Sequence, residues 1–209
     1  DKIETIGAGR TDTGVHAKQM FAHFDTSIEF DKAQVLYQLN CILPDDIAIK
    51  NIFNVHPKAH ARFDALSRSY EYHICKNKNP FLKDYAWYVF QDLNIEQMNK
   101  AAQILFKHID FTSFSKSNTQ TYTNNCTVTE AIWREENEQL VFHITANRFL
   151  RNMVRAIVGT LIDVGSGKLS IEDFNNIIES KNRSNAGISV PAHGLYLTKI
   201  TYPFISSEL

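Results

Sequence analysis

Residues 149–164 restrict the possible folds more than any other part of the chain. Large apolar residues recur there at spacings of three and four, which is the period of one helix face, and Gly165 or Gly167 follows as a stop signal. The apolar positions are Phe149, Leu150, Met153, Val154, Ile157, Val158, Leu161 and Ile162. Such a helix needs other elements to cover its apolar face, so we expect a layered fold around it.

Alternating apolar and polar residues predict strands on both sides of that helix. The predicted strands cover residues 2–6, 20–25, 48–54, 67–76, 127–135, 139–145 and 195–202. The strands at 127–135 and 139–145 are separated by Glu136-Asn137-Glu138, which predicts a hairpin. Strands and helices interleave with antiparallel hairpins, so the predicted fold class is α+β rather than a doubly wound parallel sheet.

Three further helices are predicted from their start signals. Asp31 is a candidate N-cap for a helix over 31–41, and Asn94 is one for a helix over 94–108. Ser170 and Asp173 have the spacing of a capping box, which predicts a helix that ends near residue 180.

Composition limits the possible partners only weakly. The 209 residues are 44% hydrophobic, and 22 Lys and Arg oppose 23 Asp and Glu, for a net charge of -1. Nucleic-acid binding would therefore need a locally basic face. The three cysteines are far apart in sequence, which argues against a disulfide framework and favours the cytoplasm. No apolar run approaches the roughly 20 residues that span a bilayer, so no membrane partner is expected.

The stretch from Gly7 to Gly14 places the carboxylate of Asp12 two residues after Arg10 in a glycine-rich turn. Such a turn is typical of an active-site loop, because glycine allows close backbone approach to a ligand. An ordinary polar connection between two strands explains the pattern equally well. The G-x-G-x-x-x-x-G spacing lacks the Lys-Ser/Thr that ends a phosphate-binding loop, which argues against nucleotide binding. Asp12 would stay ionised in a water-poor loop only with a cationic or N–H partner.

Three arginines are candidate partners for that carboxylate. Arg148, Arg151 and Arg155 have the i, i+3, i+7 spacing of one stripe on the predicted apolar helix. A solvated polar face explains Arg148 and Arg151 as well as a binding role does. Apolar residues surround Arg155 in sequence, so we expect its guanidinium to be partly buried and paired with a carboxylate.

Aromatic and basic residues interleave in a second segment. Tyr70 and Tyr72 share one face of the strand predicted at 67–76, and Arg62 and Arg68 lie close by in sequence. Nucleobases stack on such aromatic groups and phosphates bind the adjacent cations. The alternative is that both tyrosines are core residues.

A metal site has little support. His56 and His60 have H-x-x-x-H spacing, but a proline between them opposes a helix and no acidic or cysteine ligand is close in sequence. A metal-dependent hydrolase would instead have to combine His16, His23 and Asp12. We expect no metal.

These motifs resemble those of the tRNA pseudouridine synthase A family over essentially the whole chain. Residues 9–17 are similar to its G-R-T-D-x-G-V-H-A signature, residues 61–65 with 68–72 to its second motif, residues 149–155 with 157–159 to its third, and residues 191–197 to its closing P-A-x-G-L-x-L element. The resemblance implies two ferredoxin-like halves that form a mainly antiparallel sheet with helices on one side. The expected halves are residues 1–64, which carry the catalytic loop and would lack their first strand and helix, and residues 65–209.

The resemblance also implies an activity and roles for individual residues. The family isomerises uridine to pseudouridine in the anticodon stem-loop of tRNA, at positions 38–40, without a cofactor or metal, and works as a homodimer. Asp12 would be the catalytic aspartate, Arg155 its partner and Tyr70 the residue that packs on the target base. Arg10, beside Thr11, would fill the place that the flipped base leaves. The expected substrate-binding residues are Arg10, Thr11, Arg62, Arg68, Arg148 and Arg151. The alternative function is a non-catalytic RNA-binding module that uses the same basic, aromatic cleft.

Overall fold

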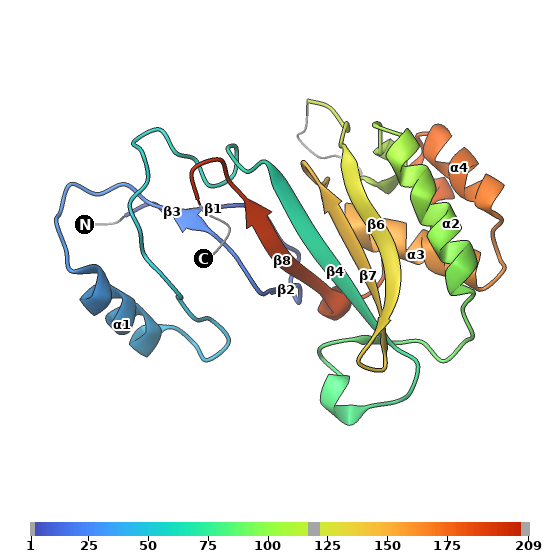
Figure 1. Ribbon diagram of the computed structural model, residues 1–209, viewed down its shortest axis with the longest axis horizontal. Helices are drawn as coiled ribbons and strands as arrows, with labels where there is room; N and C mark the ends of the chain where they lie inside the picture. Colours follow the sequence, from blue (N-terminus) through green and yellow to red (C-terminus); the bar gives the residue numbers. More distant parts are fainter. Residues whose placement is uncertain (1–2, 117–121, 206–209) are drawn as a thin grey trace.

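A computed structural model describes residues 3–116 and 122–205 of the chain. A sheet with helices α2, α3 and α4 forms one end of the molecule, and helix α1 with a small two-stranded ribbon forms the other (Figure 1). The strands are β1 (Ile6–Gly7), β2 (His16–Ala17), β3 (Ala22–His23), β4 (Ser67–Cys75), β5 (Trp87–Tyr88), β6 (Val128–Glu136), β7 (Gln139–Ala146) and β8 (Leu195–Thr201). The α-helices are α1 (Lys32–Ile42), α2 (Ile95–Ile104), α3 (Met153–Gly165) and α4 (Ile171–Glu179).

The sheet has the strand order β2-β8-β4-β7-β6, with β5 also paired to β4. The three long pairings, β4 with β7, β4 with β8 and β6 with β7, are antiparallel, whereas β2 with β8 and β4 with β5 are parallel. The chain order β4-α2-β6-β7-α3-β8 with the spatial order β8-β4-β7-β6 is a ferredoxin-like unit. The predicted α+β class is therefore confirmed.

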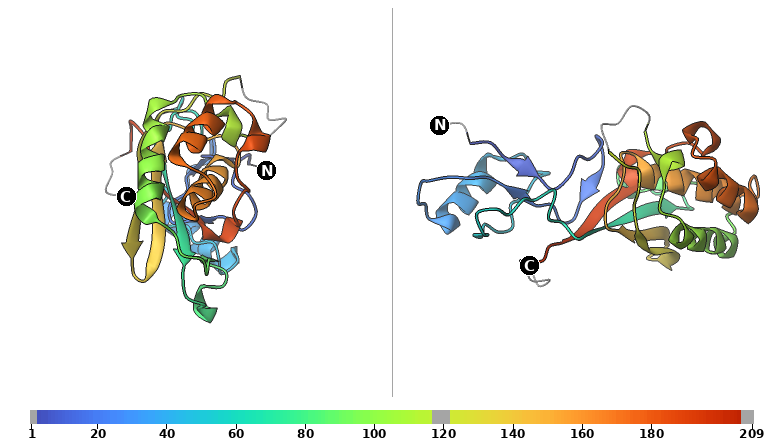
Figure 2. Two further views of the ribbon diagram at one scale, coloured as in Figure 1. Left: turned by 90° about the vertical axis from the view of Figure 1, so that its right-hand side faces the viewer. Right: turned by 90° about the horizontal axis from the view of Figure 1, so that it is seen from above.

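The core lies between the sheet and the helices. Tyr72 and Ile74 of β4 and Phe142 of β7 are fully buried and belong to one cluster with Ile157 and Leu161 of α3. The predicted apolar face of residues 149–164 is thus covered by the sheet, as its width requires. Viewed from above, β8 runs from this larger body towards the smaller one that carries α1 (Figure 2).

Local start and turn signals are confirmed. Asp31 and Asn94 are the N-caps of α1 and α2, and their side chains accept backbone N–H groups of the first turn. Ser170 and Asp173 form a complete capping box at α4. The β6–β7 hairpin turns at Asn137 and Glu138, which both have positive φ, 48° and 62°. This matches the two-residue turn that hairpins prefer.

Strand predictions in the first 54 residues were less successful. The strands predicted at 2–6 and 20–25 shrink to β1 and β3, of two residues each, and residue 2 lies outside the described residues. The strand predicted at 48–54 is wrong, because no strand pairs with this segment in the described part of the chain. The side chain of Asn40 instead bonds both backbone groups of Ile49, at 2.7 and 2.9 Å.

The start of the apolar helix also needs correction. Helix α3 begins at Met153, four residues later than predicted, because Asn152 adopts a left-handed conformation with φ 67°. Asparagine tolerates this conformation better than most residues. Arg148 and Arg151 therefore precede the helix, so the predicted helical stripe through Arg148, Arg151 and Arg155 is wrong.

None of the described helices is both long enough and apolar enough to cross a bilayer.

Candidate active site

Asp12 lies in the loop that connects the β1–β3 ribbon to the main sheet. The loop starts at Ala8, whose N–H donates to the carbonyl of Phe21 at 2.8 Å. It ends at β2, where His16 pairs with Tyr196 of β8. Gly14 within the loop has a φ of 84°, which strongly favours glycine over other residues. The loop is thus fixed at both ends while Asp12 projects from its middle.

The structure brings Asp12 and Arg155 together across 143 residues of sequence. Nη1 of Arg155 donates to Oδ2 of Asp12 at 2.8 Å, and Nε of Arg155 donates to the carbonyl of Val190 at 2.6 Å. The side chain of Asp12 is 27% exposed and that of Arg155 is 19% exposed. Arg151 lies farther away, with its Nε 3.7 Å from Oδ1 of Asp12, and its side chain is 60% exposed. Asp12 is therefore held by one shielded guanidinium while part of the carboxylate faces solvent.

The two tyrosines of β4 differ in their surroundings. Tyr72 is fully buried, and its hydroxyl donates to the carbonyl of Pro191 at 2.9 Å. Burial raises the pKa of Tyr72 far above its ordinary value, so it is a neutral core residue. Tyr70 packs edge-on against Phe149, with ring centroids 5.1 Å apart, and is only partly buried. Burial also raises the pKa of Tyr70, so its phenol is neutral and suited to stacking.

Residues 190–194 supply backbone hydrogen-bond acceptors to two side chains of the site. They supply the carbonyl of Val190 to Arg155 and the carbonyl of Pro191 to Tyr72. A Cβ on Gly194 would lie 2.8 Å from the Tyr72 ring, so only glycine fits there. Sequence reasoning did not identify the Val190 carbonyl, because a backbone acceptor leaves no signal in residue type.

Positive charge gathers around Tyr70. Burial is the main cause that lowers the pKa of Arg68. Tyr202 and Tyr70 partly oppose it, and the nearby charges of Arg62 and Arg148 lower the pKa by smaller amounts. Among the residues that the structure describes, neither Arg62 nor Arg148 forms an ion pair. Like charges held together without carboxylate partners are a favourable place for an anion.

The remaining predicted binding residues lie on the Asp12 loop. Arg10 and Thr11 are both exposed beside Asp12, and no hydrogen bond holds either side chain within the described ranges. Both side chains are free to meet a ligand at Asp12.

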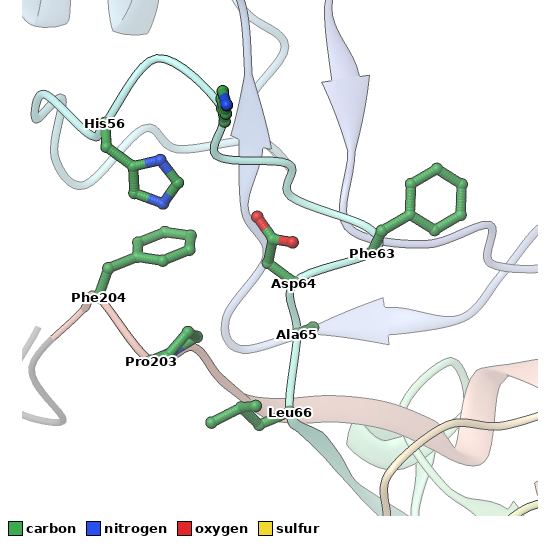
Figure 3. A pocket seen from close by; sticks show the side chains of 8 residues that line it. His56, Phe63, Asp64, Ala65, Leu66, Pro203 and Phe204 are labelled. Atoms are coloured by element: carbon green, nitrogen blue, oxygen red, sulfur yellow. The ribbon is translucent and has the colours of Figure 1, made fainter.

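A hollow of about 490 Å³ lies elsewhere (Figure 3). His56 and Phe204 face each other across it edge to face, at 4.9 Å between centroids, and Asp64 points towards it. None of the predicted site residues lines it.

The histidines considered as metal ligands have other partners. The His16 ring stacks between Tyr85 and Tyr196, and its Nε2 lies 2.9 Å from the carbonyl of Asp84. Nδ1 of His23 accepts the N–H of Ala61 at 3.1 Å. Within residues 3–116 and 122–205, no three His, Cys, Asp or Glu side chains are grouped so that they could hold a metal ion.

The fold and this site place the chain among known enzymes. Residues 101–203, from the second half of α2 to just beyond β8, match the family model described as tRNA pseudouridine synthase. A protein of Porphyromonas gingivalis named tRNA pseudouridine synthase A is 52% identical over 205 residues, which is 96% of this chain and 81% of that protein. A Bacillus subtilis protein of the same name is 40% identical over 204 residues, which is 97% of this chain and 83% of that protein. The chain belongs to the tRNA pseudouridine synthase A family of isomerases.

Proposed function

We propose that this chain converts uridine to pseudouridine in the anticodon stem-loop of tRNA, at positions 38–40, and that Asp12 is its catalytic residue. The observation that carries the proposal is the contact between Asp12 and Arg155, since it holds in place a carboxyl group that is still partly exposed. A module that only binds RNA would gain nothing from a carboxylate facing a phosphodiester backbone.

The reaction is an isomerisation, so its atoms balance without a co-reactant. The bond from N1 of uracil to C1′ of ribose breaks, the base turns, and a bond from C5 to C1′ forms. C5 then releases its hydrogen as a proton, and N1 gains one. An ionised carboxylate can serve this sequence either by attacking the sugar carbon or by removing a proton from the sugar. In both cases the hydrogen bond from Arg155 would hold Asp12 in position.

The uridine must leave its stack before Asp12 can reach it. Unstacking and unpairing a base costs a few kcal/mol, which stacking on Tyr70 would partly offset. The partial exposure of Tyr70 and its support by Phe149 suit that role. The exposed Arg10 and Thr11 would contact the nucleotides that flank the extruded base and fill the space it leaves.

Phosphates would bind the positive groups around the site. We assign this role to Arg62, Arg148 and Arg151, whose charges are close to Arg68 or Asp12. Each phosphate contact releases counterions, so affinity for tRNA should fall steeply as salt rises. Arg68 was predicted to have the same role, but its guanidinium is bonded to backbone carbonyls.

The remaining parts of the proposal concern organisation. We propose that residues 1–64 and 65–209 form the two halves of the enzyme, because Asp12 comes from the first and Arg155 from the second. We further propose a homodimer that acts in the cytoplasm without a cofactor. The three free cysteines fit a reducing compartment.

Replacing Asp12 by asparagine tests the catalytic assignment. Unmodified tRNA labelled with tritium at C5 of uridine should release tritium with the wild-type protein and none with Asp12→Asn, while both bind tRNA with similar Kd. Asp46→Asn, which changes an exposed carboxylate outside the site, is the matched control and should keep full activity. Normal release by Asp12→Asn would refute the assignment. Tight binding without release by the wild type would favour the RNA-binding alternative.

A further inference from the structure

Arg68 donates hydrogen bonds to backbone carbonyls of three separate segments. Its Nη2 donates to the carbonyls of Ala8 at 2.9 Å and Arg62 at 2.7 Å, and its Nη1 donates to that of Asn147 at 3.5 Å. The guanidinium group presents five donors in a rigid plane, so one such side chain can bridge several acceptors. Arg68 therefore connects parts of the chain that are far apart in sequence.

The contact with Ala8 lies where the catalytic loop begins. Ala8 is completely buried, and its N–H donates to the carbonyl of Phe21, so Arg68 supplies the bond on its carbonyl side. The glycines on either side of Ala8 have no side chains to fix the path of the backbone, and a Cβ on Gly9 would meet nothing within 4 Å. The hydrogen bonds at Ala8 therefore act together with the burial of its side chain to set the direction in which the loop leaves towards Asp12.

The other contacts of Arg68 lead to the rest of the site. Asn147 follows the end of β7 and begins the segment that carries Arg148 and leads into α3, the helix of Arg155. Arg68 also precedes Tyr70 by two positions on β4, so both lie on the same face of the strand. One guanidinium therefore connects the strand of Tyr70 with the loop of Asp12 and the entry to the helix of Arg155.

A phosphate would have to compete with these carbonyls for the same donors. Arg62 offers a useful comparison, because it lies beside Arg68 but its side chain is exposed. In the described structure the Arg62 side chain contacts only the ring of Phe63, at 5.5 Å from the ring centroid. A side chain free in solvent can follow a phosphate, whereas one bonded to buried backbone cannot do so without releasing it.

We propose that Arg68 is a positioning residue, which holds the Asp12 loop and the Tyr70 strand in their reactive arrangement instead of contacting tRNA phosphates. This inference rests on the proposed function, since it concerns the geometry of the same reaction. A misplacement of about 1 Å at a reacting group can cost on the order of 100-fold in rate. Loss of Arg68 should therefore act on the chemical step rather than on tRNA affinity.

The test compares Arg68→Gln with Arg62→Gln. Single-turnover tritium release with enzyme in excess reports the chemical step, and tRNA Kd at several salt concentrations reports phosphate contacts. We expect Arg68→Gln to lower the rate by about 10- to 100-fold with Kd and its salt dependence unchanged. Arg62→Gln, at a proposed phosphate contact, should raise Kd and reduce the slope of log Kd against log salt by about one.

Two further measurements separate positioning from general stability. Arg68→Lys keeps the charge but lacks the planar guanidinium whose Nη1 and Nη2 reach carbonyls of separate segments, so its rate should remain low while its Tm stays close to that of the wild type. Millimolar guanidinium should restore part of the rate of Arg68→Ala, whereas sodium chloride at equal ionic strength should not. A loss of stability alone would not produce this rescue.

Other outcomes overturn the proposal. A higher Kd with a smaller salt slope for Arg68→Gln makes Arg68 a phosphate contact, whatever its rate. A wild-type rate for Arg68→Gln or Arg68→Lys leaves Arg68 without a role in positioning. Failure of the proposed function itself would look different, because the wild-type protein would then release no tritium.

Discussion

Replacing Arg155 by lysine tests whether the shape of the guanidinium, and not only its charge, prepares Asp12 for reaction. Arg155 uses Nη1 for Asp12 and Nε for the carbonyl of Val190. Lysine carries its charge on a single nitrogen, so it cannot keep both contacts in the same geometry. Either Asp12 or the Val190 carbonyl loses its partner.

The size of the effect follows from the distance and the shielding of the pair. At 2.8 Å, with both side chains less than one-third exposed, a hydrogen bond between charged groups contributes about 1.5–3 kcal/mol. If that energy is lost from the transition state, the rate falls by about 10- to 150-fold. Arg151 is the matched control, because at 3.7 Å and 60% exposure its ion pair contributes at most about 1 kcal/mol. Arg151→Lys should slow the reaction by about fivefold or less.

The assay is single-turnover release of tritium from C5-labelled tRNA, with enzyme concentration well above Kd. Circular dichroism and Tm show whether each variant is folded under the assay conditions. The reasoning is refuted if Arg155→Lys reacts within about threefold of the wild type. It is also refuted if Arg151→Lys is the slower of the two variants, since the longer and more exposed contact would then be the important one.

Two further predictions concern stability. Gly159→Ala should destabilise the fold by at least about 1–3 kcal/mol in urea unfolding, because the new Cβ would lie 1.9 Å from the carbonyl oxygen of Ile188. Gly9→Ala should change stability little, because a Cβ at that position meets nothing within 4 Å. Equal effects of the two substitutions would contradict the packing argument. Burial alone would raise the pKa of Glu71, but hydrogen bonds from Lys18 and His73 outweigh it and lower the pKa below the ordinary 4.5. The contribution of Glu71 to stability is thus complete above about pH 4.5 and is lost as the pH falls through the lowered pKa. Glu71→Gln should therefore be less stable than the wild type at pH 7, and the difference in unfolding free energy between the two proteins should narrow in acid. Unfolding at a series of pH values would measure this difference, and a difference that widens in acid would show the sign to be wrong.

Local signals in the sequence predicted helix starts in both bodies of the molecule. Asp31 and Asn94 mark helix starts because their short side chains accept backbone N–H groups wherever such a helix forms. The strand predicted at 48–54 failed because a strand needs a neighbour, and local alternation says nothing about whether one is present. Helix α3 starts late because of the backbone conformation of Asn152, which periodicity cannot reveal.

For the candidate site too, the sequence indicated local properties of residues but not the contacts between distant segments. Apolar neighbours in sequence indicated that Arg155 is shielded, but its contact with Asp12 depends on how two distant segments are folded together. Tyr70 and Tyr72 have the same position in the strand pattern, but only Tyr72 is fully buried in the core cluster, where its hydroxyl bonds the carbonyl of Pro191. The carbonyl contacts of Arg68 also lie outside any sequence pattern, so its residue type suggested a phosphate ligand instead.

The central position of β8 has a consequence for synthesis on the ribosome. This strand, the last that the structure describes, lies between β2 and β4, so it separates the anchor of the Asp12 loop from the strand of Tyr70. A nascent chain that stops short of residue 195 has no strand to which His16 and Ala17 can pair. Activity therefore requires that the ribosome has already translated β8, and we expect products released before that point to be catalytically silent.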